Sequence, residues 1–306
     1  MTLNDCNDHF YAITRSTNRD EIKSHLQLLL KEASILSFEQ GQGEHYWRGV
    51  FAESEPFRPV SRITYAPPTM ARINRMNDAG SPMVYCARSV NTVLAELRVQ
   101  PGDYVQWFCF TRAPNKYLRL CVLGELKHVA QTGHTQMHGI DPKKTIRRLI
   151  AERGRDGARR LVYIDGLLSS LLAQSKSESK DYLTTRILAE LALEQADSRG
   201  LTYRSFEDAS GVNVALIPSI FESHTRIICC QHVRINKVHK GSSHRPNRYN
   251  YTLLHTATAI DDKHEFVWRQ AGNLKELNLF NLTLRERDLI DGRKNGEGPF
   301  RFLNPD

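Results

Sequence analysis

Hydrophobic residues recur at helical spacing in three segments of the chain. The strongest pattern lies in Asp181–Arg199 and predicts a helix that Gly200 ends. A second helix is predicted for residues 89–99, with Ser89 or Asn91 as its N-cap, and a third follows a cap at position 17 or 18. The apolar positions are Leu183, Ile187, Leu188, Leu191 and Ala192 in the first segment, Val90, Val93, Leu94 and Leu97 in the second, and Ile22, Leu26, Leu29 and Leu30 in the third.

Short runs rich in β-branched and aromatic residues predict strands between and after these helices. They lie at 46–51, 82–87, 104–110, 117–123, 201–205, 213–218 and 226–235. Pro114-Asn115 is a turn signal, so we expect the strands on either side of it to form a hairpin or to lie adjacent in one sheet. Helices and strands in this mixed order predict an α+β protein.

Composition narrows the class of protein. The chain has 306 residues, of which 40% are hydrophobic and 25% charged, the balance of a soluble globular protein with one large domain or two small ones. No apolar run approaches a membrane span and the N-terminus lacks a signal-peptide core, so we expect a cytoplasmic protein with no membrane partner. The six cysteines form no C-x-x-C pair, and we interpret them as reduced thiols.

The net charge of +8 favours anionic partners: phosphates, nucleic acid or an acidic protein. Residues 124–180 are interpreted as an insertion that contains a basic helix at 143–153 and ends in a polar stretch at 169–180. A solvated basic face is the favoured interpretation of that helix, because no interleaved aromatic residues suggest stacking on single strands. A nucleic-acid surface using 143–160 and 234–248 stays as an alternative function.

Candidate chemistry gathers in residues 72–99. A guanidinium (Arg75), a phenol (Tyr85) and a carboxylate (Glu96) come from a loop, a strand and a helix, and such a unit can close a pocket over an anionic ligand. Arg48 lies among aromatic residues, and a buried arginine needs an anionic partner, either an internal carboxylate or a ligand phosphate. Ser205 has neither a histidine nor a glycine elbow beside it, so it is a strand or cap serine, or a hydrogen-bond donor to a ligand, rather than a hydrolase nucleophile.

No metal site is predicted. His239 and His244 lack helical ligand spacing, and the cysteine spacing does not fit a zinc ribbon. A Rossmann G-x-G-x-x-G before a helix is also missing, so the sequence shows no motif for holding a dinucleotide as a resident hydride carrier.

Several segments of the chain resemble the RES family, named for its arginine, glutamate and serine. The matching segments are Tyr46-Trp47-Arg48-Gly49, Asn74-Arg75-Met76-Asn77 with Gly80, Val84-Tyr85, Ala95-Glu96, Asp181-Tyr182-Leu183-Thr184-Thr185, Gly200-Leu201-Thr202-Tyr203-Arg204-Ser205 and Gly211-Val212-Asn213-Val214-Ala215-Leu216. They stand in the family's order over roughly 44–238. The chain departs from the family at Asn74, where glycine is usual, and at Met76, where an aromatic residue is usual.

This resemblance implies a fold and an activity. It implies a compact, strongly bent mixed sheet flanked by helices, similar to the ADP-ribosyltransferase fold. It also implies a toxin that destroys NAD by cleaving the nicotinamide–ribose bond through phosphorolysis or hydrolysis, with inorganic phosphate as the co-substrate in the first case. The alternative that it leaves open is ADP-ribosyl transfer to a macromolecule.

The resemblance further implies roles for individual residues. Glu96, Arg75 and Tyr85 are the predicted catalytic residues, and Arg48, Asn77 and Ser205 are the predicted substrate-binding residues. No resident cofactor is expected. Expected partners are NAD, an antitoxin or another regulatory protein, and a second copy of the chain. A resting state released by infection is the other form of control. We divide the chain into an N-terminal helical segment (1–43), a RES-like domain (44–240) and a C-terminal extension (241–306).

Overall fold

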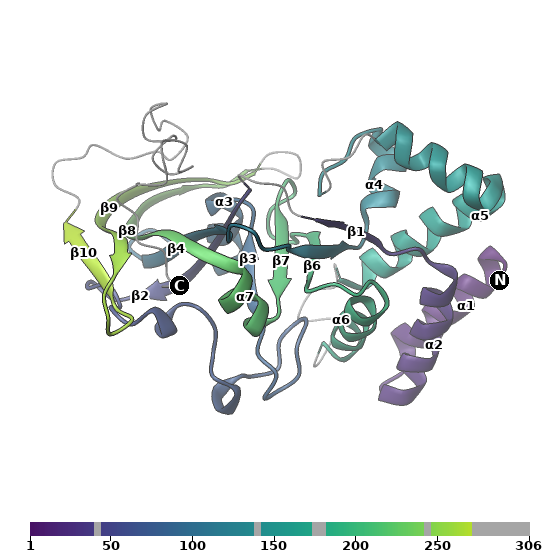
Figure 1. The fold of residues 1–306 in the computed structure, drawn as a ribbon. Coiled ribbons are helices and arrows are strands. Elements are labelled where there is room, and N and C mark those ends of the chain that lie inside the picture. The colour runs from purple at the N-terminus through teal and green to yellow at the C-terminus, as the bar shows by residue number, and fades with distance from the viewer. Residues whose placement is uncertain (40–43, 138–141, 173–181, 242–245, 271–306) are drawn as a thin grey trace.

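The computed structural model describes residues 1–39, 44–137, 142–172, 182–241 and 246–270 (Figure 1). The helices are α1 (Leu3–Arg15), α2 (Arg19–Glu32), α3 (Val90–Leu97), α4 (Glu125–Thr132), α5 (Pro142–Leu172), α6 (Leu183–Gln195) and α7 (Pro218–His224). The strands are β1 (Leu36–Glu39), β2 (His45–Ala52), β3 (Val84–Ala87), β4 (Tyr104–Arg112), β5 (Arg119–Val122), β6 (Gly200–Arg204), β7 (Val212–Leu216), β8 (Thr225–His239), β9 (Arg248–Ile260) and β10 (Phe266–Gln270).

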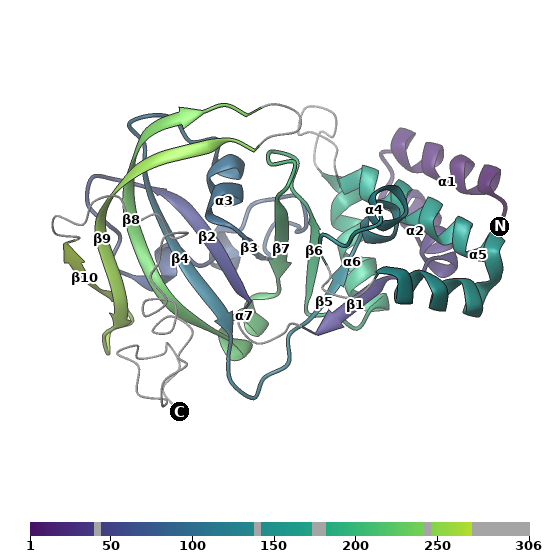
Figure 2. The ribbon, with the colours of Figure 1, turned by 90° about the horizontal axis from the view of Figure 1, so that it is seen from above.

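All of these strands belong to one sheet, in the order β1-β5-β6-β7-β3-β2-β4-β8-β9-β10. The pairing of β5 with β6 is parallel and the other pairings are antiparallel, so the sheet is mixed. The long strands β8 and β9 curve over α3 (Figure 2). The predicted α+β class with a bent mixed sheet flanked by helices is therefore confirmed.

The two faces of the sheet carry different cores. On one face, Trp107 of β4 packs with Val90 and Leu94 of α3, which lies directly on β2. A Cβ added at Gly49 of β2 would come within 2.7 Å of Val93 on α3, so glycine is what allows this close approach. On the other face, Phe108 packs with Phe110 of the same strand and with Phe221 of α7.

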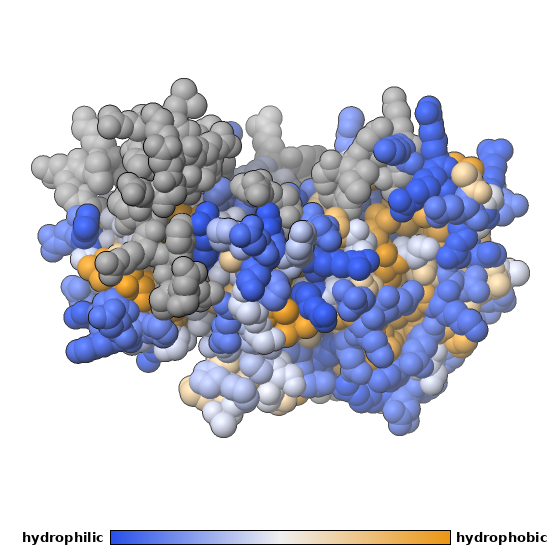
Figure 3. All heavy atoms as spheres, viewed as in Figure 1, coloured by the Kyte–Doolittle hydropathy of each residue, from blue (hydrophilic) through white to orange (hydrophobic). Residues whose placement is uncertain are grey.

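The helical end of the molecule forms a third core. Helices α1, α2, α5 and α6 pack together beside β5 and β6, at the right of Figure 1. The predicted third helix is confirmed as α2, with Asn18 accepting hydrogen bonds from the amides of Asp20 and Glu21 as its N-cap. Figure 3 shows hydrophilic residues over most of this end, with hydrophobic patches between them.

One predicted strand pairing is wrong. The turn at Pro114-Asn115 forms, with Asn115 at φ 57°, but β4 and β5 do not pair across it. Strand β4 instead pairs with β2 and β8, and β5 pairs with β1 and β6. A turn signal is local, whereas strand pairing is decided by contacts between segments that are distant in the sequence.

The predicted end of the strongest helix is also wrong. Helix α6 ends at Gln195, and Asp197 at φ 44° turns the chain while the amide of Ser198 bonds the carbonyl of Leu193 at 3.0 Å. Gly200 starts β6 instead. A Cβ there would come within 2.5 Å of the side chain of Leu216, so glycine serves close strand packing and not helix termination.

The remaining segment predictions differ in outcome. The predicted strand at 226–235 belongs to the single long strand β8, and β9 and β10 continue the same sheet beyond it. Residues 169–172 of the predicted polar stretch end α5, while 173–180 and His244 lie outside the described residues. The division of the chain into three segments stays a prediction.

Candidate active site

The turn that carries Arg75 is held by Tyr85 of β3. The hydroxyl of Tyr85 accepts a hydrogen bond from the amide of Met76 at 2.9 Å and donates one to Oδ1 of Asn77 at 2.7 Å. Nδ2 of Asn77 donates to the carbonyls of Arg72 (3.0 Å) and Asp78 (2.8 Å). Burial raises the pKa of Tyr85, so the phenol stays protonated and keeps its role as a donor.

Arg75 itself reaches across to the helical end of the molecule. Its Nη1 donates to the carbonyl of Leu172, the last residue of α5, and its guanidinium carbon lies 5.4 Å from the centre of the Tyr182 ring. The hydroxyl of Thr185, on α6, donates to the carbonyl of Arg75 at 2.6 Å. The exposed carbonyls at a helix C-terminus carry partial negative charge, which favours a cation here.

Arg48 lies where β2 and β3 separate. The two strands pair only at Trp47 and Ala87, and past that point Nη1 of Arg48 donates to the carbonyl of Tyr85 at 2.8 Å. Its Nε donates to the carbonyl of Ile63 at 2.9 Å. Burial lowers the pKa of Arg48, and among the described residues no carboxylate forms an ion pair with it. Of the two expected anionic partners, the internal carboxylate is therefore not found in the described ranges.

Glu96 stands on the exposed side of α3, a helix that Ser89 caps by accepting the amide of Thr92 at 3.1 Å. One carboxylate oxygen, Oε1, accepts two hydrogen bonds of 2.6 Å, from Oγ of Ser205 and from Nδ2 of Asn213. No residue in the described ranges hydrogen-bonds to Oε2. The carboxylate is thus fixed through one oxygen while the other is open to a ligand.

The turn that follows Ser205 is tied to the start of α3. Oγ of Ser205 accepts the amide of Asp208 at 3.0 Å, and Oδ2 of Asp208 accepts the hydroxyl of Thr92 at 2.7 Å. A Cβ at Gly211 would come within 2.7 Å of Thr92, so the turn lies tightly against the helix. Ser205 and Glu96 therefore belong to one hydrogen-bonded unit that joins α3, β6 and β7.

Two residues of the site escape sequence reasoning. Asn213 is assigned only to a strand, and Tyr203 only to the strand before Ser205. Their strands pair with Tyr203 opposite Asn213, which places both side chains on the face of Tyr85. Burial raises the pKa of Tyr203, Tyr85 and Glu96 raise it further and Arg75 lowers it, so Tyr203 lies near groups from both parts of the site.

The six predicted site residues fall into two connected groups. Arg75, Asn77 and Tyr85 form one group, to which Arg48 is joined through the carbonyl of Tyr85. Glu96 and Ser205 form the other, and the pKa of Tyr203 is affected by members of both groups. Within the described ranges, no cluster of three or more His, Cys, Asp or Glu side chains could hold a metal. No described helix has the length and apolarity that a membrane crossing requires.

The fold and the site define an α+β protein in which the carboxylate of Glu96 is held through one oxygen. The two arginines of the site, Arg48 and Arg75, lie on segments that both bond to Tyr85. The family model of the RES domain matches residues 45–235, well over half of the chain, so this protein belongs to the RES domain family. A comparison with curated proteins finds no match.

Proposed function

We propose that this protein consumes NAD by cleaving the bond between nicotinamide and ribose. The observation that carries the proposal is the carboxylate of Glu96, which is held through Oε1 by Ser205 and Asn213 and leaves Oε2 open. Membership of the RES domain family supports a substrate of this kind. The similarity of the fold to ADP-ribosyltransferases is part of the proposal.

The chemistry of the bond suits such a site. Nicotinamide is a cationic leaving group: the C1′–N1 bond breaks, its electron pair returns to the pyridine nitrogen, and no general acid is needed. The ribosyl carbon gains oxocarbenium character, as in glycoside cleavage, and Oε2 of Glu96 can bind a ribose hydroxyl and stabilise the positive charge. An oxygen of phosphate or water then bonds to C1′, which gives ADP-ribose phosphate or ADP-ribose and a proton.

Arg48 and Arg75 are the residues that we propose bind the pyrophosphate of NAD. Arg48 is a partly buried cation without a carboxylate partner in the described ranges, and a guanidinium forks onto two phosphate oxygens. Arg75 is presented by a turn that Tyr85 and Asn77 hold. We assign Tyr85, Asn77 and Ser205 to positioning, because their polar groups already bind protein.

The decisive experiment measures nicotinamide released from NAD by the purified chain, with and without phosphate, and identifies the second product by mass. Glu96→Gln keeps the shape of the side chain and removes the charge, so we expect release to fall by about 10²–10³-fold. Glu190→Gln is the matched control and should retain activity, because Glu190 is an exposed carboxylate of α6 that pairs with Arg19 and Lys23 of α2.

The product also separates the alternatives. ADP-ribose phosphate indicates phosphorolysis, free ADP-ribose indicates hydrolysis, and label transferred from NAD to a protein or nucleic acid indicates an ADP-ribosyltransferase. Release of no nicotinamide under any of these conditions would end the proposal.

Depletion of NAD would injure the producing cell, so we further propose that a partner protein inhibits the enzyme. An acidic segment, or a C-terminal carboxylate, inserted toward Arg75 and Arg48 would mimic the pyrophosphate. Expression of the wild-type chain alone should lower cellular NAD, and expression of Glu96→Gln should not.

A further inference from the structure

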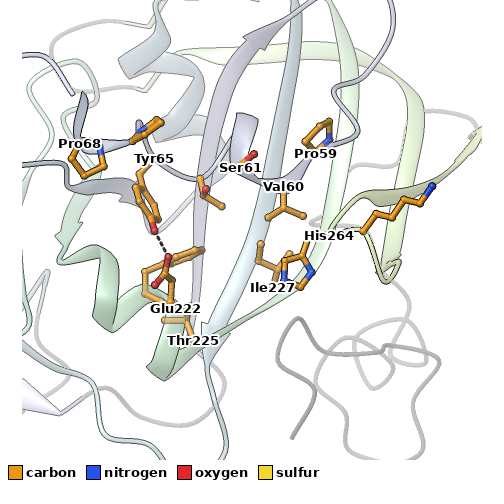
Figure 4. A pocket seen from close by; sticks show the side chains of 13 residues that line it. Pro59, Val60, Ser61, Tyr65, Pro68, Glu222, Thr225, Ile227 and His264 are labelled. Carbon is orange, nitrogen blue, oxygen red and sulfur yellow. Dashed lines mark hydrogen bonds between the residues drawn. The ribbon is translucent and has the colours of Figure 1, made fainter. Parts of the chain in front are cut away.

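A cavity of about 610 Å³ lies on the sheet face opposite α3, away from Glu96. Its walls are the segment 59–68, helix α7, the start of β8 and the turn before β10 (Figure 4). The volume is that of pockets that take small molecules, about 300–1,000 Å³. The lining is mostly apolar, with Val60, Phe221 and Ile227 among its residues, and it shares no residue with the candidate active site.

The two ends of the cavity are polar and different in charge. At one end the hydroxyl of Tyr65 donates to Oε1 of Glu222, and this hydrogen bond raises the pKa of Tyr65 to about 12. At the other end stand Lys263 and His264, which are exposed and form no ion pair among the described residues. Figure 4 shows Tyr65 and Glu222 on one side and His264 on the other, with Val60 and Ile227 next to His264.

The position of His264 is built into the fold. Its backbone has φ 58°, a left-handed conformation that few non-glycine residues adopt. Its carbonyl accepts the amide of Val60 at 3.1 Å, so the turn before β10 is tied to the segment 59–68 that forms another wall of the cavity. The cationic end therefore has a defined place relative to the apolar wall.

The cavity wall is also connected to the candidate active site. Ile63 lies within the segment that lines the cavity at Ser61 and Thr64, and it is buried. Its carbonyl accepts Nε of Arg48, whose Nη1 holds the carbonyl of Tyr85. A ligand that shifts residues 60–65 would thus displace the guanidinium proposed to bind pyrophosphate.

We propose that this cavity is a second small-molecule site, coupled to the first. Its ligand has an apolar body of one or two rings, an anionic group directed to Lys263 and His264, and a hydrogen-bond donor directed to Glu222. Charge complementarity fixes this orientation, because an anion would be repelled by the carboxylate of Glu222. The coupling through Arg48 rests on the proposed function, whereas the site itself does not.

The test uses anilinonaphthalene sulfonate, a fluorescent probe with fused rings, a sulfonate and an anilino N–H donor. We expect saturable binding of one equivalent to the full chain. Val60→Phe fills the cavity and should weaken binding by about tenfold or more, while Val267→Phe, at an exposed position of β10, should leave it unchanged. Lys263→Gln should weaken binding by about threefold, and Lys237→Gln on β8 should not.

Thermal melting checks that each variant folds. Absence of saturable binding, or equal affinity in the wild type and in Val60→Phe, overturns the assignment of the cavity.

A second titration tests the coupling, with the Glu96→Gln variant so that NAD is not consumed. NAD should change the affinity for the probe by about threefold or more, and the probe should change the affinity for NAD by the same factor. If calorimetry shows NAD binding while the affinity for the probe stays constant, the coupling is refuted and the cavity assignment stands. If NAD does not bind, the proposed function and the coupling both fail, while Val60→Phe still decides the cavity.

Discussion

At the residue scale, one carboxylate is oriented by two neutral donors. Two hydrogen bonds of 2.6 Å to Oε1 hold the carboxylate of Glu96 in one orientation. The side chain therefore does not have to change its rotamer before Oε2 can bind a ligand. Ser205 directly follows β6 and Asn213 lies on β7, and each is itself buried. The orientation of Glu96 is thus set by the sheet and not by α3 alone.

This arrangement makes Asn213 a testable positioning residue. In Asn213→Ala, Glu96 keeps its charge and its bond from Ser205 but loses one of the two donors to Oε1. We expect nicotinamide release to fall by about tenfold, mainly in kcat with KM for NAD little changed, because orientation in the transition state is what is lost. Asn236→Ala, an exposed asparagine bonded to Thr252 on the β8–β9 ribbon, is the control. An equal loss in both variants would contradict the role of Asn213.

The Tyr85 hydroxyl should contribute to stability as well as to the site. Tyr85→Phe removes the partner of the Met76 amide and of Oδ1 of Asn77. Leaving buried polar groups unpaired costs about 1–3 kcal/mol, which urea denaturation measures directly. Tyr117→Phe, at a side chain that is 72% exposed, should be neutral. A neutral Tyr85→Phe would show that the turn is held by other contacts.

Only those residues of the candidate site that lie close together in the sequence could be predicted from it. Arg75, Tyr85 and Glu96 lie on consecutive elements, so one turn, one strand and one helix were enough to single them out. Tyr203 and Asn213 join them through the register of β6 with β7 and of β7 with β3. No periodicity in a single sequence specifies that register, because it depends on which strands pair.

At the element scale, helices were predicted more accurately than strand neighbours. The apolar spacing and the cap of α3 identify it almost to the residue, since both signals lie within the segment itself. The hairpin expected between β4 and β5 failed because β1 and β6 occupy the edges of β5. The end of α6 was missed because the left-handed residue is Asp197, which carries a weaker signal than glycine.

Helix α4 shows how one element supplies the cap of another. Its N-cap position is Gly124, which has no side chain to accept the first amides. Asp165 of α5 does so instead, through Oδ1 from the amide of Gly124 at 2.8 Å and Oδ2 from the amide of Lys127 at 3.0 Å. Burial raises the pKa of Asp165 from 3.8 to about 6, although these hydrogen bonds act in the opposite direction.

The sign of the resulting pH dependence follows from the direction of the shift. The folded state binds the Asp165 proton more tightly than the unfolded state, so this group favours folding below about pH 4. That contribution, on the order of 3 kcal/mol, is lost as the pH rises to about 6. Asp165→Ala leaves two amides uncapped and should be less stable, by a margin that narrows between about pH 4 and pH 7. Urea unfolding of both proteins across this range measures the margin; a margin that widens would contradict the prediction.

At the scale of the whole molecule, the charge of +8 includes the basic residues of α5, and several of these are paired in the described part of the chain. On the basic helix α5, Arg148 lies 3.5 Å from Glu152, Arg160 lies 3.4 Å from Glu32, and Arg153 donates to the hydroxyl of Ser34 at 3.1 Å. Exposed pairs of this kind add little stability, but they lower the local positive potential. These contacts favour the solvated-face interpretation of α5 over a nucleic-acid surface.

That interpretation leads to a prediction about salt. A protein that neutralises Z phosphates loses affinity for duplex DNA with a log–log slope of about −0.9Z, and dedicated binders contact about 6–10 phosphates. We expect weak binding here, with a slope equivalent to about three phosphates or fewer. Arg147→Glu with Arg155→Glu reverses two exposed charges on α5, and Arg269→Glu on β10 is the control for a charge reversal outside this helix. Fluorescence anisotropy against salt concentration measures the slopes. A steep slope in the wild type that the α5 double variant removes, and Arg269→Glu does not, would establish nucleic-acid binding as a function of this helix.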